Sequence, residues 1–190
     1  MSLDPRPGDA LVIVDLQNDF LPGGALAVPD GDAVIAPLNA AIAAFAARGL
    51  PIIATRDWHP AAHCSFTAQG GIWPPHCVAD TNGAAFSSRL QLPASTIVLS
   101  KAATVEEDAY SGFQGTDLAH QLRDMAVQRI IVGGLATDYC VLNTVLDGLE
   151  AGFEVLLLED AIRAVEVNAG DGAAAVARMR DGGAALAHAA

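Results

Sequence analysis

Three residues with complementary chemistry lie at the ends of expected strands in this sequence. Asp15 ends a short β-branched apolar run, Lys101 ends the strand from Ser95, and Cys140 follows the strand from Arg129, at the start of a helix. A helix N-terminus and a nearby cation favour the thiolate, which is the nucleophilic form of cysteine, and a neighbouring carboxylate can move the proton. Together these residues predict nucleophilic catalysis by Cys140. Taken singly, each has an ordinary explanation: Asp as a cap, Lys as a surface charge and Cys as a core residue.

A second cluster lies in a loop that reads RDWHPAAHCSF at its start and IWPPHC at its end. Asp57 and His59 are two residues apart, so in an extended segment they share a face, and His63 and His76 can return from the loop. A mixed Asp/His set suits Zn²⁺, Fe²⁺ or Mn²⁺. The residues predict a divalent metal site. The alternative is that the histidines only cap and hydrogen-bond a rigid Pro-rich loop, with its tryptophans as core packing.

Composition limits the classes of protein and partner that fit. The chain has 190 residues, 52% of them hydrophobic and 17% charged, which favours a single globular domain over residues 1–190. Ten Lys and Arg against 22 Asp and Glu give a net charge of −12. That balance argues against nucleic acid or an anionic membrane as partner. Three cysteines, an odd number, indicate reduced thiols rather than a disulfide framework.

Neither a membrane span nor a signal peptide is expected. The longest uncharged apolar stretch, Ala40 to Ala47, is far shorter than the roughly 20 residues that a spanning helix needs. The first residues contain Asp4, Arg6 and Asp9 and lack a basic n-region and a small-residue cleavage site. A cytoplasmic location is therefore expected.

Apolar runs alternate with helical patterns along the chain. This alternation predicts an α/β fold: a doubly wound, mainly parallel sheet with helices on both faces and its chemistry at the carboxyl ends of the strands. The expected strands are 10–14, 51–55, 95–100, 129–133 and 153–158, and the expected helices are 33–48, 115–125, 137–151 and 168–180. The first helix is expected to begin at Asp30 or Asp32 and to stop at Gly49. The segment 56–93 has little periodicity but much Trp, His and Pro, so we expect a functional loop there.

Six motifs in this order resemble the nicotinamidase/pyrazinamidase family of the isochorismatase-like cysteine hydrolases. They are VDLQNDF (14–20), RDWHPAAHCSF (56–66), WPPHC (73–77), SKA (100–102), YSGF (110–113) and GGLATDYCV (133–141). The resemblance covers residues 11–160 and implies the isochorismatase-like fold.

The resemblance also implies roles for individual residues. Asp15, Lys101 and Cys140 match the catalytic triad, and Asp57, His59 and His76 match the metal ligands, while His63 matches a position that only some members use as a ligand. The Leu135–Ala136 peptide would be cis, and the backbone N–H groups of Ala136 and Cys140 would form the oxyanion hole. Phe20, Trp73 and Tyr110 match positions that line the substrate pocket.

The activity implied by the resemblance is hydrolysis of nicotinamide to nicotinate and ammonia, a step of NAD salvage, with pyrazinamide as a further substrate. One divalent ion is expected as cofactor, Zn²⁺ ahead of Fe²⁺ or Mn²⁺, and a small aromatic amide as the partner. Homo-oligomerisation is left open. The alternatives are another amide or carbamoyl hydrolase of the same superfamily, or a non-enzymatic metal-binding module.

Overall fold

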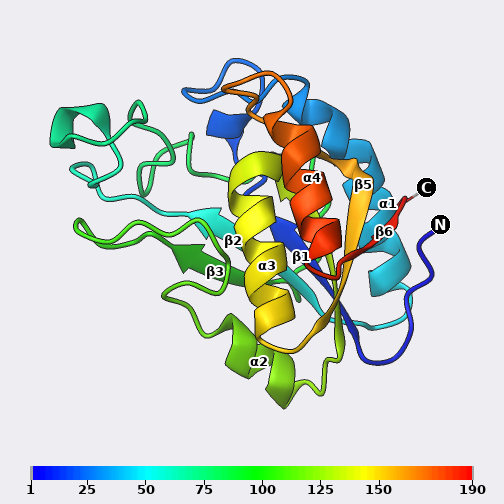
Figure 1. Cartoon of the computed structure of the whole chain (residues 1–190). Helices are drawn as coiled ribbons and strands as arrows, with labels where there is room; N and C mark the ends of the chain where they lie inside the picture. Colours follow the sequence, from blue (N-terminus) through cyan, green and yellow to red (C-terminus); the bar gives the residue numbers. More distant parts are fainter. Residues whose placement is uncertain (1, 190) are drawn as a thin grey trace.

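A parallel β-sheet forms the centre of the computed structural model, which describes residues 2–189 (Figure 1). Every neighbouring pair of strands in the sheet is parallel. In spatial order the strands are β3 (Ile97–Lys101), β2 (Ile52–Asp57), β1 (Asp9–Val14), β4 (Arg129–Leu135), β5 (Glu154–Arg163) and β6 (Ala185–Ala187). The predicted α/β fold with a parallel sheet is confirmed.

Helices cover both faces of this sheet. Figure 1 shows α3 and α4 in front of the sheet and α1 behind it. The helices are α1 (Ile35–Ala46), α2 (Leu118–Asp124), α3 (Leu142–Glu150) and α4 (Asp171–Asp181). Within residues 2–189, none of them is long and apolar enough to span a membrane.

The sequence of β1 shows why the sheet is covered on both sides. Its six residues, DALVIV, are all buried. Leu11 and Ile13 pack into the core cluster on the α1 side, whereas Ala10, Val12 and Val14 pack into the cluster formed with α2, α3 and α4. Alternate side chains of a strand point to opposite faces, so a strand buried on both faces is mostly apolar. The exception in β1 is Asp9, which forms an ion pair with Arg129.

The strand order reverses between β1 and β4, which are direct neighbours in the sheet. The chain moves outward from β1 through β2 to β3 and then returns to β4 on the other side of β1. In open α/β sheets, ligands bind outside the carboxyl ends of the strands at such a switch point. The carboxyl ends of β1, β2, β3 and β4 are therefore the expected place for a site.

Gly134 allows β1 and β4 to approach closely at this edge. It adopts φ +130°, and a Cβ placed there would lie 2.1 Å from the carbonyl oxygen of Val14. No other residue fits such a contact without moving a strand. Directly after it, the Leu135–Ala136 peptide bond is cis, as the resemblance implied.

The segment between β2 and β3 is long but ordered by backbone pairing. It contains the short 3₁₀-helix η3 (Thr67–Gln69) and the isolated bridges His59↔Val78 and Phe66↔Trp73. In Figure 1 it forms the teal-to-green lobe that projects from the carboxyl ends of the strands. A further bridge, Gln17↔Phe86, joins it to the loop after β1. The expected functional loop is thus a fixed lobe beside the switch point.

Several boundaries differ from the sequence-based expectation. A 3₁₀ turn, η2 (Gly31–Val34), precedes α1, and Asp30 adopts a left-handed conformation there without a side-chain cap. Gly49 follows the end of α1 at φ +64°, which agrees with the expected stop. β5 continues to Arg163, and the short edge strand β6 was not expected, because its three residues give too little pattern.

Candidate active site

Asp15 follows β1 directly and is fully buried. It adopts a left-handed backbone conformation, φ +47°. Its Oδ1 accepts a hydrogen bond of 2.7 Å from the hydroxyl of Thr55 on β2. Its Oδ2 lies 2.9 Å from Lys101 Nζ and has no aligned hydrogen bond within residues 2–189. One carboxylate oxygen is thus held in place while the other retains a free lone pair.

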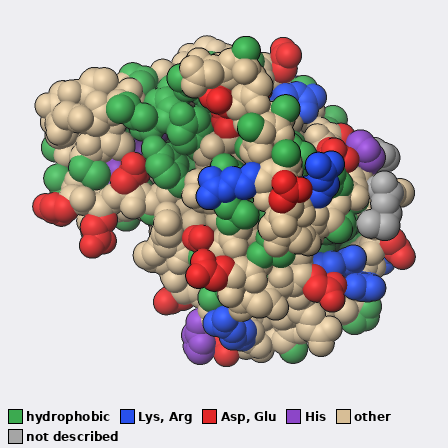
Figure 2. All heavy atoms as spheres, viewed as in Figure 1, with side chains coloured by type: hydrophobic (Ala, Val, Ile, Leu, Met, Phe, Trp, Pro, Cys, Tyr) green, Lys and Arg blue, Asp and Glu red, His purple; other side chains and the backbone are tan. Residues whose placement is uncertain are grey.

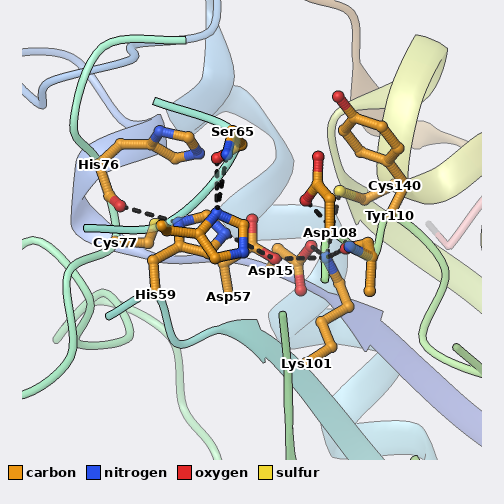
Figure 3. A network of polar contacts seen from close by, with 12 residues as sticks. Asp15, Asp57, His59, Ser65, His76, Cys77, Lys101, Asp108, Tyr110 and Cys140 are labelled. Carbon is orange, nitrogen blue, oxygen red and sulfur yellow. Dashed lines mark hydrogen bonds and ion pairs between the residues drawn. The ribbon is translucent and has the colours of Figure 1, made fainter. Parts of the chain in front are cut away.

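Lys101 is the last residue of β3, and its ammonium group lies at the centre of the site (Figure 3). Nζ donates to Asp57 Oδ1 at 2.5 Å and to the carbonyl oxygen of Ala109 at 3.0 Å. It also lies 3.4 Å from Cys140 Sγ. Lys101 and Asp57 are register partners on adjacent parallel strands, which explains why these two side chains meet.

Cys140 lies in the π-helical turn η4 (Thr137–Val141), which connects β4 to α3. The side chain of Cys140 is buried, and its sulfur lies beside Lys101. The carbonyl oxygen of Ala136 accepts the N–H groups of Tyr139 and Val141, both at 3.1 Å. Asn143 Nδ2 donates to the carbonyl oxygen of Tyr139 at 2.8 Å. The structure therefore brings Cys140 together with the two other residues predicted as catalytic.

Charge in this cluster is unbalanced, because one ammonium lies among two carboxylates and a thiol. Burial raises the pKa of the Cys140 thiol, and Lys101 offsets this only in part, while Asp15 and Asp57 raise it further. Burial likewise raises the pKa of Asp15 against the opposing effect of Lys101. Burial lowers the pKa of Lys101, but attraction by Asp15 and Asp57 outweighs it, so that pKa lies well above its usual value. The direction of this shift is opposite to the favoured thiolate that the sequence led us to expect.

Asp57, His59 and His76 form a second cluster next to the first, and their ligand atoms all lie within 4.8 Å of one another. His59 Nδ1 lies 3.0 Å from the carbonyl oxygen of His76, and His76 Nδ1 lies 2.8 Å from that of Pro74. A carbonyl only accepts, so each Nδ1 carries a proton, which leaves Nε2 as the nitrogen that can ligate a metal. Burial also lowers the pKa of His59 to about 4, which keeps it neutral. One carboxylate and two imidazoles fit a divalent transition metal.

His63 has a different environment from the other two histidines. Its ring stacks on that of His59, with centroids 4.2 Å apart. Nδ1 accepts the N–H of Ser65 at 3.3 Å, and Nε2 donates to the carbonyl oxygen of Glu107 at 3.1 Å. Both ring nitrogens are engaged by the protein, although His63, His59 and Asp108 also form a group with ligand atoms within 4.8 Å. Its role as a ligand stays a prediction.

An aromatic pocket is lined by residues of both clusters. Phe20, Trp73 and Tyr110 all line it, and Trp73 Nε1 donates to Tyr110 Oη at 3.0 Å. The other lining residues are Leu26, Asp57, His76, Ala136, Tyr139, Cys140 and Val165. Figure 2 shows hydrophobic side chains gathered between the projecting lobe and the side of the molecule that carries α3 and α4.

Several residues that shape the site were missed by sequence reasoning. Tyr139, Leu26 and Val165 line the pocket, but only Tyr139 lies inside a motif, directly before the cysteine. Gln17 is fully buried, and its side chain forms two hydrogen bonds with the backbone of Asp57. It donates to the carbonyl at 2.7 Å and accepts from the N–H at 2.8 Å. The available signal for Gln17 was its place inside the motif VDLQNDF, two residues after Asp15.

Comparison with known proteins agrees with this geometry. Residues 9–190 match the isochorismatase domain model. The chain is 41% identical to a nicotinamidase of Escherichia coli (strain K12), over 95% of this chain and 94% of that protein. It is 40% identical to a nicotinamidase/pyrazinamidase of Mycobacterium tuberculosis (strain ATCC 25618 / H37Rv), over 84% of this chain and 88% of that protein.

A solved structure, that of Pyrococcus horikoshii pyrazinamidase in complex with zinc, superposes with a TM-score of 0.92 at 47% identity. The match covers 96% of this chain and 99% of that one. Sequence and fold therefore agree, and the chain belongs to the isochorismatase domain family.

Proposed function

We propose that this chain is a cysteine amidase that hydrolyses nicotinamide to nicotinate and ammonia in NAD salvage, and that it also accepts pyrazinamide. One observation carries the proposal: Cys140, with Lys101 Nζ 3.4 Å from its sulfur, lines the same aromatic pocket as the metal-cluster residues Asp57 and His76. The pocket thus offers a nucleophile to an amide and a flat apolar wall to the ring that bears it. The named relatives, all nicotinamidases or pyrazinamidases, support this substrate class.

Asp15 is the general base and acid of the proposed reaction. Its free Oδ2 takes the proton of the Cys140 thiol as the sulfur attacks the amide carbonyl carbon, and the C–N bond then breaks. Asp15 returns that proton to the departing nitrogen, so ammonia leaves and a thioester remains on Cys140. Water then attacks the thioester, its proton passes to the thiolate through Asp15, and the carboxylic acid is released. Lys101 holds Asp15 in place and compensates the negative charge of the sulfur.

The raised pKa of the Cys140 thiol fits a mechanism in which proton transfer accompanies attack. A thiolate formed before substrate arrives would add a third negative group beside a single ammonium. The Ala136 and Cys140 backbone N–H groups are the proposed oxyanion hole, and both residues line the pocket. A donor of this kind contributes roughly 3 to 4 kcal/mol to transition-state stabilisation in well-studied hydrolases.

Asp57, His59 and His76 are the proposed ligands of one divalent ion, with zinc expected. When bound, the ion would supply a positive charge that attracts the lone pair of the substrate's ring nitrogen and offsets the excess negative charge of the carboxylates. The chain's own contribution is to fix the two imidazoles by their Nδ1 hydrogen bonds to backbone carbonyls. The side chain of Gln17 also fixes Asp57, through hydrogen bonds to the backbone carbonyl and N–H of Asp57.

We further infer that residues 1–190 act as one domain in the cytoplasm. The three cysteines are free thiols, and Cys64, the most exposed of them, has no disulfide partner among residues 2–189. Free thiols are usual in a reducing compartment.

The test is release of ammonia from nicotinamide by the purified protein, before and after removal of metal with a chelator. Turnover that disappears in the chelated protein and returns with zinc supports the proposal. Cys140→Ala is the matched control and must be inactive with and without zinc. Absence of ammonia release from nicotinamide by the zinc-loaded wild type would refute the function.

A further inference from the structure

The segment between β5 and α4 is tied to the turn that carries the nucleophile. Asp138, in η4, accepts the N–H of Val165 on Oδ1 at 2.9 Å and the N–H of Glu166 on Oδ2 at 3.0 Å. Asp138 and these two partners are 27 and 28 residues apart in sequence, so the bonds join separate parts of the chain. Both carboxylate oxygens are therefore used to hold one short piece of backbone.

The same segment is anchored at its other end by Glu166. Its carboxylate accepts the N–H of Gly170 at 2.7 Å and that of Gly172 at 2.9 Å, at the start of α4. Glu166 itself has φ +56°, a conformation that side-chain-bearing residues rarely adopt. Its backbone needs outside support to stay in that conformation, and Asp138 supplies part of it.

Val165, held in this way, lines the substrate pocket together with Tyr139 and Cys140. The Asp138 side chain therefore holds Val165, which forms one wall of the pocket, while its backbone leads directly into Tyr139 and Cys140 on another. An ordinary role as an acid at a helix start does not account for this, since η4 has no side-chain cap and both hydrogen bonds go to the distant segment.

We propose that Asp138 is a positioning residue that sets the distance between the Val165 wall and the nucleophile, and thereby determines which ring substituents the pocket admits. The inference rests on the proposed amidase function. Asp138 does not line the pocket, so it acts through Val165.

Asp138→Asn tests this role with little change in size. The amide keeps one accepting oxygen, but its NH₂ group must face a backbone N–H, so one of the two bonds becomes a donor–donor contact. Val165 then moves relative to Cys140. We expect KM for nicotinamide to rise about 10-fold with kcat within about 3-fold, because binding of the ring is lost more than the chemistry.

Specificity gives the sharper readout. For wild type, Asp138→Asn, Val165→Ala and the double variant, kcat/KM is measured on nicotinamide and on nicotinamides methylated at ring position 4, 5 or 6. A single methyl group in an apolar pocket changes kcat/KM by roughly 10 to 200-fold. The ratio of kcat/KM for a methylated substrate to kcat/KM for nicotinamide does not depend on the fraction of enzyme that is folded. Loss of folded protein alone therefore does not change this ratio.

We expect both single variants to shift this ratio by about 10-fold or more, in the same direction and for the same methyl position. The double variant should shift it no further than Val165→Ala alone, because Asp138 acts through that side chain. Asp160→Asn is the matched control, because the Asp160 carboxylate also accepts a backbone N–H, that of Ala189 at 2.9 Å, but does not line the pocket. The ratio measured for this variant should equal the wild-type value.

An unchanged ratio in Asp138→Asn would overturn the proposal, and so would shifts of the two single variants that add in the double variant. Turnover of unmethylated nicotinamide by the wild type, measured first, tests the amidase function by itself. The two proposals therefore fail on different measurements.

Discussion

Replacement of Lys101 by methionine removes the ammonium between two buried carboxylates and keeps the length of the side chain. In the wild type, Nζ lies 2.9 Å from Asp15 Oδ2 and 2.5 Å from Asp57 Oδ1, and the side chain is fully buried. Loss of one partner from a buried ion pair destabilises a protein by about 3 to 5 kcal/mol, because the remaining charge stays buried without compensation. For a chain of this size that corresponds to a decrease in Tm of about 6 to 20 °C.

The size of this loss should depend on pH. Burial already raises the pKa of Asp15, and Lys101 opposes that increase. Without the ammonium, the pKa of Asp15 in the folded state rises further above its unfolded value of about 3.9. A carboxyl group with a raised folded pKa costs stability that grows as pH rises from the unfolded pKa to the folded one. The variant should therefore be closer to wild type at pH 5 than at pH 7.5.

Urea and thermal unfolding of chelated wild type, Lys101→Met and Lys101→Met/Asp15→Asn at both pH values measure this effect. The double variant should regain part of the stability at pH 7.5, because it buries one charge fewer. Arg48→Met is the control: it breaks an exposed ion pair with Asp4, which is 86% exposed, and should lose at most about 1 kcal/mol. Wild-type stability of Lys101→Met at pH 7.5, or a larger loss at pH 5, would refute the reasoning.

Four other predictions concern the chemistry of the site. Cys140→Ala should abolish ammonia release while Cys64→Ala retains most of it, since Cys64 does not line the pocket; the reverse pattern would assign the nucleophile to Cys64. In the chelated protein, the rate of Cys140 alkylation by iodoacetamide, followed by mass spectrometry as a function of pH, should have its midpoint above the usual thiol pKa of about 8.5, because burial raises the pKa of this thiol. The same shift makes stability fall as pH rises past about 8.5, where the unfolded thiol loses its proton first, and a midpoint near neutrality would contradict both statements. Asp15→Asn should keep native circular dichroism and lose about 10²- to 10⁴-fold in kcat, and substantial remaining activity would exclude it as the base. His76→Ala should lose its metal in elemental analysis, whereas His63→Ala should weaken zinc binding by about 10 to 100-fold; equal retention of zinc by both would argue against His76 as a ligand.

The convergence of the catalytic residues could be predicted because it depends on strand ends. Asp15 and Cys140 follow apolar runs that mark buried strands, and Lys101 ends the run that marks the partly exposed edge strand β3. Parallel strands bring their carboxyl ends to one edge. Periodicity also placed the helices. It could not place β6 or the extension of β5, because pairing with neighbours decides where those strands begin and end.

The electrostatics of the site could not be predicted in the same way. The sequence assigns Asp57 to the metal cluster, and nothing in its spacing indicates that the same carboxylate also contacts Lys101 at 2.5 Å. Burial of Cys140, together with the charges of Asp15 and Asp57, outweighs the effect of Lys101 and raises its pKa, opposite to the expected direction. The hydrogen bonds from Val165 and Glu166 to Asp138 could not be predicted from the sequence either, since these residues are 27 and 28 positions away.

The close approach of β1 and β4 at Gly134 affects how a mutational scan of this protein should be interpreted. Any side chain at Gly134 would collide with the Val14 carbonyl, and Val14 is the residue directly before Asp15. A substitution there separates the base from the nucleophile without removing either of them. In a screen for lost activity, Gly134 would therefore score like a member of the triad although it has no reactive group. Scoring abundance beside activity would not distinguish Gly134 from the triad if the strands stay folded.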